Sequence, residues 1–131
     1  MQPQPAAPRP ITIVLADDHT VMRSGLRMLL DAEQDLVVVA EAGDIKSVFV
    51  AVRGHRPTVL VLDLNMPGGS SVEAIPRLTA ISPRTSVVVL TMEADRAVVR
   101  DVFGAGASGY VLKEAAGEEL VRTIRKAATG A

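Results

Sequence analysis

Residues 11–30 read ITIVLADDHTVMRSGLRMLL, and this stretch shows the pattern from which the fold is predicted. An apolar run rich in β-branched residues (11–16) precedes two adjacent aspartates, and apolar residues at helical spacing follow them. Short, continuous apolar runs are typical of strands that are buried on both faces, as in parallel sheets. The stretch therefore predicts a buried strand, a polar turn at its carboxyl end, and a helix that packs back against the sheet.

The same pairing of an apolar run with a helical pattern continues along the chain. Further strand-like runs occur at residues 36–40, 58–62, 86–90 and 109–112, and a helical pattern follows each. Such alternation predicts an α/β fold, namely a flavodoxin-like, doubly wound, five-stranded parallel sheet of order 2-1-3-4-5 with five helices. A five-stranded fragment of a larger α/β fold is the alternative. The third helix, expected at residues 71–81, contains Pro76, which should kink or shorten it.

Composition places the chain among globular proteins and excludes several functions. Its 131 residues suit one domain, with 48% apolar and 22% charged residues. The absence of cysteine excludes disulfides, cysteine-ligated zinc and thiol catalysis. The net charge of −1 disfavours a dedicated nucleic-acid surface, and the apolar runs are far too short for a membrane span. No export signal is evident, so we expect a cytoplasmic protein with no membrane partner.

The first ten residues, MQPQPAAPRP, contain four prolines and differ in composition from the rest of the chain. Proline removes backbone donors and favours extended conformers, so residues 1–10 are predicted to be a disordered, proline-rich leader. The folded domain is predicted at residues 11–131.

Polar residues follow the central strand-like runs at the point where each run ends. Asp17 and Asp18 follow the first run, Asp63 the third, Thr91 the fourth and Lys113 the fifth. In doubly wound sheets the carboxyl ends of the strands open into one functional crevice. Taken singly, these residues suit a helix cap, a turn, a strand end and a solvated surface lysine. Their joint placement predicts instead an acidic pocket that contains a hydroxyl and an amine.

The charge of this pocket indicates a divalent cation. Three carboxylates repel one another, and one ammonium only partly compensates them. Mg²⁺ prefers hard oxygen ligands of this kind, and we expect His19, which follows the aspartates, to be a polar surface residue rather than a ligand. A carboxylate beside Mg²⁺ and a lysine suits phosphoryl transfer, in which aspartate can be the covalent acceptor.

Four stretches of the chain, taken in order, resemble a known family. They are ITIVLADDHTVMRSGLRMLL (11–30), VLVLDLNMPGGSSVEAI (59–75), VVVLTMEAD (87–95) and GASGYVLKEAAGEELVRTIRKAATG (106–130). The set resembles the receiver domain of bacterial two-component response regulators, with the NarL/FixJ-type subgroup as the nearest in pattern. The resemblance covers nearly all of residues 11–131. It implies a phosphorylation-controlled switch in signal transduction rather than a conventional enzyme.

The resemblance implies that Asp63 is the phosphoacceptor. Thr91 would donate a hydrogen bond to the phosphoryl group, and Lys113 would pair with it. Tyr110 matches the switch aromatic of the family, whose rotamer follows the threonine.

The resemblance also implies a metal site and two residues that tune the switch. Asp18, Asp63 and the backbone carbonyl of Asn65 would ligate Mg²⁺, while Asp17 would act mainly through a metal-bound water. Asn65 and Glu93 occupy positions that tune the rate of dephosphorylation in the family.

The resemblance implies a sensor histidine kinase as partner, which supplies a phosphohistidine, and leaves open whether the chain forms a homodimer. DNA would be bound only through a C-terminal helix-turn-helix domain, which is absent from this chain, so the expected output is regulation of transcription. Arg122, Arg125 and Lys126 near the end of the last helix are interpreted as complementing the helix dipole. Glu114 follows Lys113 where many receivers have proline, so no cis peptide is expected there.

Three other functions fit the sequence less well. A Mg²⁺-dependent phosphohydrolase of the haloacid-dehalogenase type would need Asp-x-Asp after its first strand, whereas this chain has adjacent aspartates there. A nucleotide-binding domain is disfavoured because neither G-x-G-x-x-G after the first strand nor a P-loop motif is present. A receiver-like interaction module that works without phosphate is disfavoured by the complete acidic set.

Overall fold

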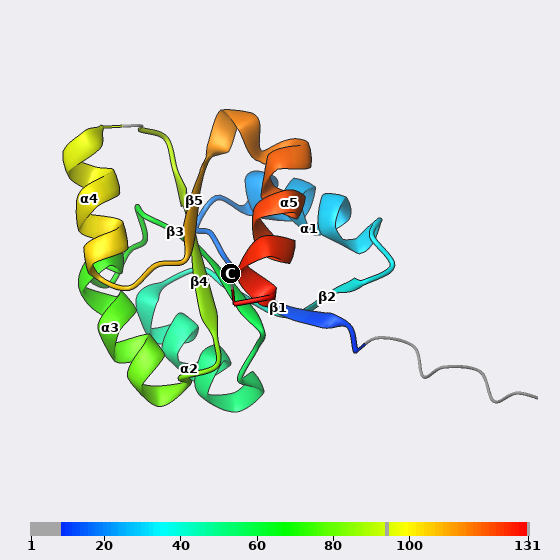
Figure 1. Ribbon diagram of the computed structural model, residues 1–131, viewed down its shortest axis with the longest axis horizontal. Coiled ribbons are helices and arrows are strands. Elements are labelled where there is room, and N and C mark those ends of the chain that lie inside the picture. Colours follow the sequence, from blue (N-terminus) through cyan, green and yellow to red (C-terminus); the bar gives the residue numbers. More distant parts are fainter. Residues whose placement is uncertain (1–8, 94, 131) are drawn as a thin grey trace, which may run out of the picture.

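The structure is a computed structural model and describes residues 9–93 and 95–130. Strands and helices alternate along the chain (Figure 1). In order they are β1 (Ile11–Ala16), α1 (Thr20–Asp31), β2 (Leu36–Ala42), α2 (Ile45–His55), β3 (Val59–Asp63), α3 (Ser71–Ile81), β4 (Ser86–Thr91), α4 (Arg96–Gly104), β5 (Gly109–Leu112) and α5 (Ala116–Ala128). A short 3₁₀ turn, Lys113–Ala115, separates β5 from α5. Of the predicted leader, residues 1–8 lie outside the described part of the chain, and Arg9 and Pro10 form neither helix nor strand.

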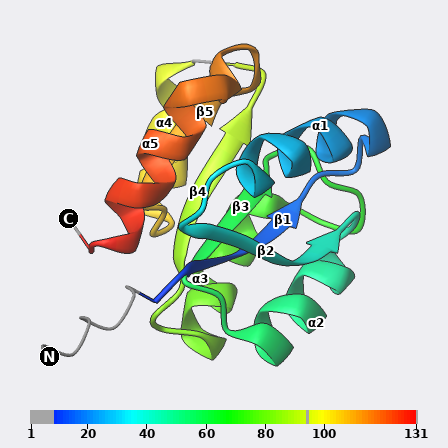
Figure 2. The ribbon, with the colours of Figure 1, turned by 90° about the vertical axis from the view of Figure 1, so that its right-hand side faces the viewer.

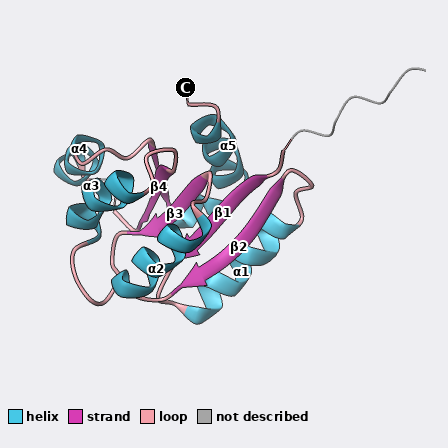
Figure 3. Cartoon of the chain, turned by 90° about the horizontal axis from the view of Figure 1, so that it is seen from below, coloured by secondary structure: helices cyan, strands magenta, loops and turns pink. Residues whose placement is uncertain are grey.

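The strands form one parallel sheet in the order β2-β1-β3-β4-β5, and Figure 3 shows the part from β2 to β4. This order confirms the predicted doubly wound, flavodoxin-like architecture. β3 is the middle strand, between β1 and β4, and every one of its residues is buried. Because all strands run in the same direction, their carboxyl ends meet at one end of the sheet.

Helices cover both faces of the sheet (Figure 2). Ile13 and Leu15 of β1 pack in the core beneath α1 and α5, whereas Val14 and Ala16 pack in the core beneath α2, α3 and α4. The residues of β3 and β4 alternate between the two cores in the same way. Burial on both faces explains why these strands have continuous apolar sequences. Among the described helices, none has both the length and the apolar character that crossing a bilayer demands.

The edge strand β2 is longer than predicted. The sequence indicated a strand at 36–40, but β2 continues to Ala42. Glu41 therefore lies within the strand, where its carboxylate accepts hydrogen bonds from Arg23 and Arg27 of α1. A charged residue is tolerated there because β2 is an edge strand that pairs with a neighbour on one side only, and Glu41 is exposed.

α3 extends over its full predicted range, so the prediction that Pro76 shortens this helix is wrong. Pro76 is exposed, and the buried side chains of Ile75 and Leu78 hold the helix against the sheet. The Ser70 hydroxyl caps the first turn by accepting a hydrogen bond of 3.2 Å from the Glu73 N–H. Packing and capping offset the backbone hydrogen bond that proline removes.

β5 and α5 approach each other closely at Gly109. A Cβ atom at this position would lie 2.8 Å from Cγ2 of Thr123 in α5, well inside van der Waals contact. The glycine thereby lets α5 pack directly on the strand that leads to Lys113.

We predict that Gly109→Ala lowers the free energy of unfolding by about 1–3 kcal/mol, because α5 must shift to admit the methyl group. Urea-induced unfolding measures this loss. Thr123→Ala removes the opposing methyl, so the double variant should recover most of it. The control Gly25→Ala lies within α1 with no heavy atom within 4 Å of the added Cβ and should stabilise by about 0.5–1 kcal/mol. Wild-type stability of Gly109→Ala would contradict the packing described.

Candidate functional site

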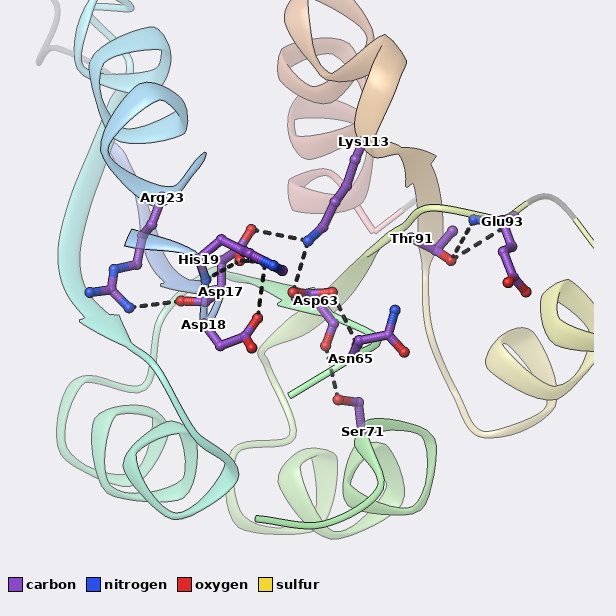
Figure 4. Close-up of polar contacts among 10 residues, drawn as sticks. All are labelled: Asp17, Asp18, His19, Arg23, Asp63, Asn65, Ser71, Thr91, Glu93 and Lys113. Atoms are coloured by element: carbon purple, nitrogen blue, oxygen red, sulfur yellow. Dashed lines mark hydrogen bonds and ion pairs between the residues drawn. The ribbon is translucent and has the colours of Figure 1, made fainter. Parts of the chain in front are cut away.

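Three charged side chains from distant segments meet at the carboxyl end of the sheet (Figure 4). Asp63 is the last residue of β3, Asp17 directly follows β1, and Lys113 directly follows β5. Nζ of Lys113 donates a hydrogen bond of 2.9 Å to Oδ2 of Asp63 and lies 3.4 Å from Oδ2 of Asp17. Both aspartates are fully buried and the lysine side chain is 5% exposed. These charges therefore interact largely out of contact with bulk water, where screening is weak.

Backbone hydrogen bonds orient both aspartates. Oδ1 of Asp63 accepts a hydrogen bond of 3.0 Å from the Asn65 N–H, and Oδ1 of Asp17 accepts one of 2.8 Å from the His19 N–H. Each carboxylate thus accepts a hydrogen bond from the backbone N–H two residues further along the chain. This arrangement is the Asx turn that aspartate favours. In both cases the other oxygen, Oδ2, is the one that approaches Lys113.

Two further residues fix the backbone at the ends of β3 and β1, and no sequence motif predicts this role for them. The buried Ser71 hydroxyl, at the start of α3, donates a hydrogen bond of 2.9 Å to the backbone carbonyl of Asp63. Arg23 of α1 donates one of 2.7 Å to the backbone carbonyl of Asp17. The serine pair before α3 indicates only a helix cap, and the Arg23 contact depends on how α1 packs in three dimensions. Both bonds tie a strand end to a neighbouring helix.

Burial and charge act in opposite directions on the ionisable groups. Burial raises the pKa of the Asp63 carboxyl, and the charge of Asp17 adds to this, although the bonds from Asn65 and Lys113 oppose it. Burial lowers the pKa of the Lys113 ammonium, but its bonds and charge interactions with Asp63 and Asp17 outweigh burial and raise that pKa overall. The lysine is therefore charged at neutral pH, and the carboxylates around it carry an excess of negative charge.

The pocket has the ligand atoms and the charge that fit a divalent cation. One potential ligand atom from each of Asp17, Asp18, His19 and Asp63 lies within 4.8 Å of the other three. Oδ2 of Asp17 is buried and has no hydrogen-bond partner, although a buried carboxylate oxygen normally has one. A cation would satisfy this oxygen and reduce the repulsion between the carboxylates. Mg²⁺ suits a set of carboxylate oxygens of this kind.

Thr91 lies at the end of β4, as predicted, but its hydroxyl bonds its own loop. The hydroxyl oxygen accepts a hydrogen bond of 3.1 Å from the Glu93 N–H and donates one of 3.3 Å to the Glu93 carbonyl. Among the hydrogen bonds of residues 9–93 and 95–130, none joins Thr91 to Asp63 or Lys113. The structure thus brings Thr91 to the same end of the sheet without bringing its hydroxyl to the acidic pocket (Figure 4).

Tyr110 connects β5 with α4. Its ring packs edge-on against Phe103 of α4, with ring centroids 6.1 Å apart and an interplanar angle of 86°. In the parallel ladder, Leu112 of the same strand pairs with Thr91. A movement of α4 or of the loop after Thr91 would therefore change the surroundings of this half-buried ring.

Arg125 does more than complement the dipole of α5. Its guanidinium donates two hydrogen bonds of 2.9 Å to the Asp35 carboxylate and one of 2.7 Å to Glu33. The bond from Arg125 lowers the pKa of Asp35. The interpretation of this arginine through the helix dipole alone is therefore incomplete, because it also ties α5 to the segment between α1 and β2.

Comparison with known proteins gives an independent assignment. Residues 13–125 match the protein family described as the response regulator receiver domain. The chain belongs to this receiver domain family. The receiver domain is 41% identical to the oxygen regulatory protein NreC of Staphylococcus epidermidis over 114 residues. These aligned residues cover 86% of this chain and 52% of NreC. The NreC protein of Staphylococcus haemolyticus is 41% identical over 121 residues, which cover 89% of this chain and 56% of the relative.

Solved structures show the same fold. The signal receiver domain of the response regulator NarL from Mycobacterium tuberculosis superposes with a TM-score of 0.89 at 27% identity, covering 95% of this chain and all of that one. A LuxR-family two-component response regulator from Aurantimonas sp. SI85-9A1 gives a TM-score of 0.87 at 34% identity and covers 92% of this chain and 86% of that chain. The protein is thus a receiver domain of the NarL/NreC type, the phosphoacceptor module of two-component signalling. It spans about half the length of the NreC relatives that it matches.

We predict that Lys113→Met lowers the free energy of unfolding by about 3 kcal/mol near neutral pH without divalent cations, because two buried carboxylates lose their ammonium. Chemical unfolding measures the loss. Asp63→Asn is the matched control: it removes one of the repelling charges, so its stability should equal or exceed that of the wild type.

The same variant should show a distinctive pH dependence. Without the lysine the pKa of Asp63 rises further, so the folded state binds a proton more tightly than the unfolded chain does. Relative to the wild type, Lys113→Met should therefore regain stability as the pH falls below neutral, because the raised pKa of Asp63 favours the protonated folded state. A variant as stable as the wild type at every pH would show that the Lys113–Asp63 pair is not buried as described.

Proposed function

We propose that Asp63 is the residue of this receiver domain that accepts the phosphoryl group. In this proposal the ammonium of Lys113 compensates the negative charge of the carboxylate. The observation that supports this most directly is the 2.9 Å bond between Lys113 and Asp63 inside a buried acidic pocket. An ammonium in this position offsets the charge of the carboxylate before transfer and can pair with the phosphoryl oxygens afterwards.

In the transfer step, an oxygen of the Asp63 carboxylate attacks the phosphorus of a phosphohistidine on a sensor histidine kinase. The P–O bond forms as the P–N bond breaks, and the departing imidazole keeps the electron pair and then takes up a proton. Later attack of water on phosphorus restores the carboxylate and releases phosphate. Asp63 is fully buried in the present state, whereas the neighbouring side chains of Asp18 and His19 are 31% and 66% exposed.

Mg²⁺ is the cofactor that we assign to this pocket. Asp18, Asp63 and the backbone carbonyl of Asn65 would hold it, with Asp17 acting mainly through a water molecule. The unpartnered oxygen of Asp17 and the excess of negative charge support this assignment. When bound, Mg²⁺ supplies positive charge that shields the transferring phosphoryl group from the carboxylates.

Phosphorylation would be read out by Thr91 and Tyr110. The Thr91 hydroxyl now bonds the backbone of Glu93, and a phosphoryl oxygen on Asp63 is a stronger acceptor that would draw it toward the pocket. The loop after β4 would follow, and with it the surroundings of Tyr110. The exposed side chains of Asn65 and Glu93 would tune the rate at which water removes the phosphoryl group.

The output of the switch would lie outside this chain. Because the chain spans about half of its NreC relatives, we propose a C-terminal helix-turn-helix domain that binds DNA in the complete protein and regulates transcription in the cytoplasm. In this proposal residues 1–10 are a leader and residues 11–131 the receiver domain.

We predict that incubation with Mg²⁺ and acetyl phosphate adds one phosphoryl group to the chain, detected by intact mass. Asp63→Asn should remove the addition, and EDTA should prevent it. Asp101→Asn, which changes an exposed aspartate of α4, is the control and should be phosphorylated like the wild type.

Two results of the same assay would favour other functions. Multiple turnover on unrelated phosphomonoesters would indicate a phosphohydrolase. A wild-type chain that stays unmodified but dimerises would indicate an interaction module that works without phosphate.

Tyr110 provides an internal reporter of the switch, because the chain has one tyrosine and no tryptophan. We predict that phosphorylation changes its fluorescence and that Thr91→Val reduces this change at least about fivefold while still accepting the phosphoryl group. The exposed Thr129→Val is the control and should respond like the wild type. If phosphorylated Thr91→Val shows the same fluorescence change as the wild type, Tyr110 responds independently of Thr91 and the proposed coupling is wrong.

A further inference from the structure

His19 lies beside the acidic pocket, and helix capping does not explain its side chain. It is the residue before α1, yet its side chain makes no capping hydrogen bond. Its backbone N–H, rather than its ring, donates to Asp17. The ring is 66% exposed, so packing does not require it either.

The position of the imidazole matches that of a metal ligand. Nδ1 of His19 lies 3.2 Å from Oδ1 of Asp18 and 3.4 Å from Oδ1 of Asp17. Two ligands at right angles around a cation, with bonds of about 2.1 Å, lie about 3.0 Å apart. The observed separations exceed this value by only a few tenths of an ångström. Small side-chain movements would therefore place Nδ1 and the carboxylate oxygens around one ion.

A second observation points independently to a cation in this pocket. Asp17 is fully buried, and its Oδ2 atom has no hydrogen-bond partner although it lies 3.4 Å from Nζ of Lys113. Oδ1 of Asp17 lies 3.4 Å from Nδ1 of His19, and Oδ2 of the same carboxylate lies 3.4 Å from Nζ of Lys113 (Figure 4). The side chains of Asp17 and His19 thus both belong to the group that could hold one cation.

We propose that His19 is an additional ligand of this cation site and that it shifts the preference of the site from Mg²⁺ toward transition-metal cations such as Co²⁺. The inference rests on the proposed function because it uses the same acidic pocket. Imidazole nitrogen is a borderline donor that Mg²⁺ binds poorly, whereas first-row transition metals accept it alongside carboxylates. The site would then offer an imidazole nitrogen in addition to its oxygen ligands.

The test compares the chain with two variants, because it contains two histidines. His19→Gln removes the proposed ligand, and His55→Gln changes the exposed histidine at the end of α2 as a matched control. Calorimetric titration with Co²⁺ and with Mg²⁺ gives the ratio of the two affinities. We expect this ratio to fall about tenfold in His19→Gln and to stay within about twofold in His55→Gln.

Electron spin-echo envelope modulation of bound Mn²⁺ detects a directly coordinated ¹⁴N nucleus. The wild type and His55→Gln should show this coupling, and His19→Gln should lose it. An unchanged affinity ratio, or no ¹⁴N coupling in the wild type, would overturn the ligand role of His19 while leaving the Mg²⁺ pocket intact. Cation affinity that survives in Asp17→Asn and in Asp63→Asn would instead overturn the pocket itself, and the proposed metal assignment with it.

Discussion

The ion pair between Lys113 and Asp63 is the interaction on which the rest of the site depends. It joins the ends of β5 and β3 across β4 and holds positive charge beside two buried carboxylates. Removing two such charges from water is costly, and the mutual attraction repays that cost only with good geometry. The geometry comes from the sheet, whose parallel strands end together, and from backbone bonds that fix each aspartate. A pocket that remains negative after this pairing is suited to a cation and to an incoming phosphoryl group.

The arrangement of the strand ends could be predicted because each buried strand is an apolar run that stops at a polar residue. Asp17, Asp63, Thr91 and Lys113 all mark such stops, and in a doubly wound sheet the stops share one end. The order of the strands followed from the alternation with helices and from the resemblance. Local patterns along the chain therefore predicted the strands and the polar residues that follow them.

The contacts that could not be predicted are those decided by packing in three dimensions. Arg23 of α1 bonds the Asp17 carbonyl because α1 packs beside the turn after β1. Arg125 of α5 bonds Asp35, 90 positions away in the sequence, because α5 packs beside the segment between α1 and β2. Pro76 leaves α3 intact because buried neighbours hold the helix, which no local propensity reveals. The Thr91 hydroxyl bonds Glu93 rather than the pocket because the loop geometry, not the strand end, sets its direction.

The central claim is that the carboxylate of Asp63 accepts phosphorus within reach of Lys113 and Thr91. A crystal structure of the chain with Mg²⁺ and beryllium fluoride, which mimics a phosphoryl group on aspartate, tests it most directly. The account predicts beryllium bonded to Asp63, with the Lys113 ammonium and the Thr91 hydroxyl both donating to fluoride and the hydroxyl released from Glu93. Beryllium fluoride bound to another carboxylate, or Asp63 unmodified with its Lys113 bond unchanged, would contradict it.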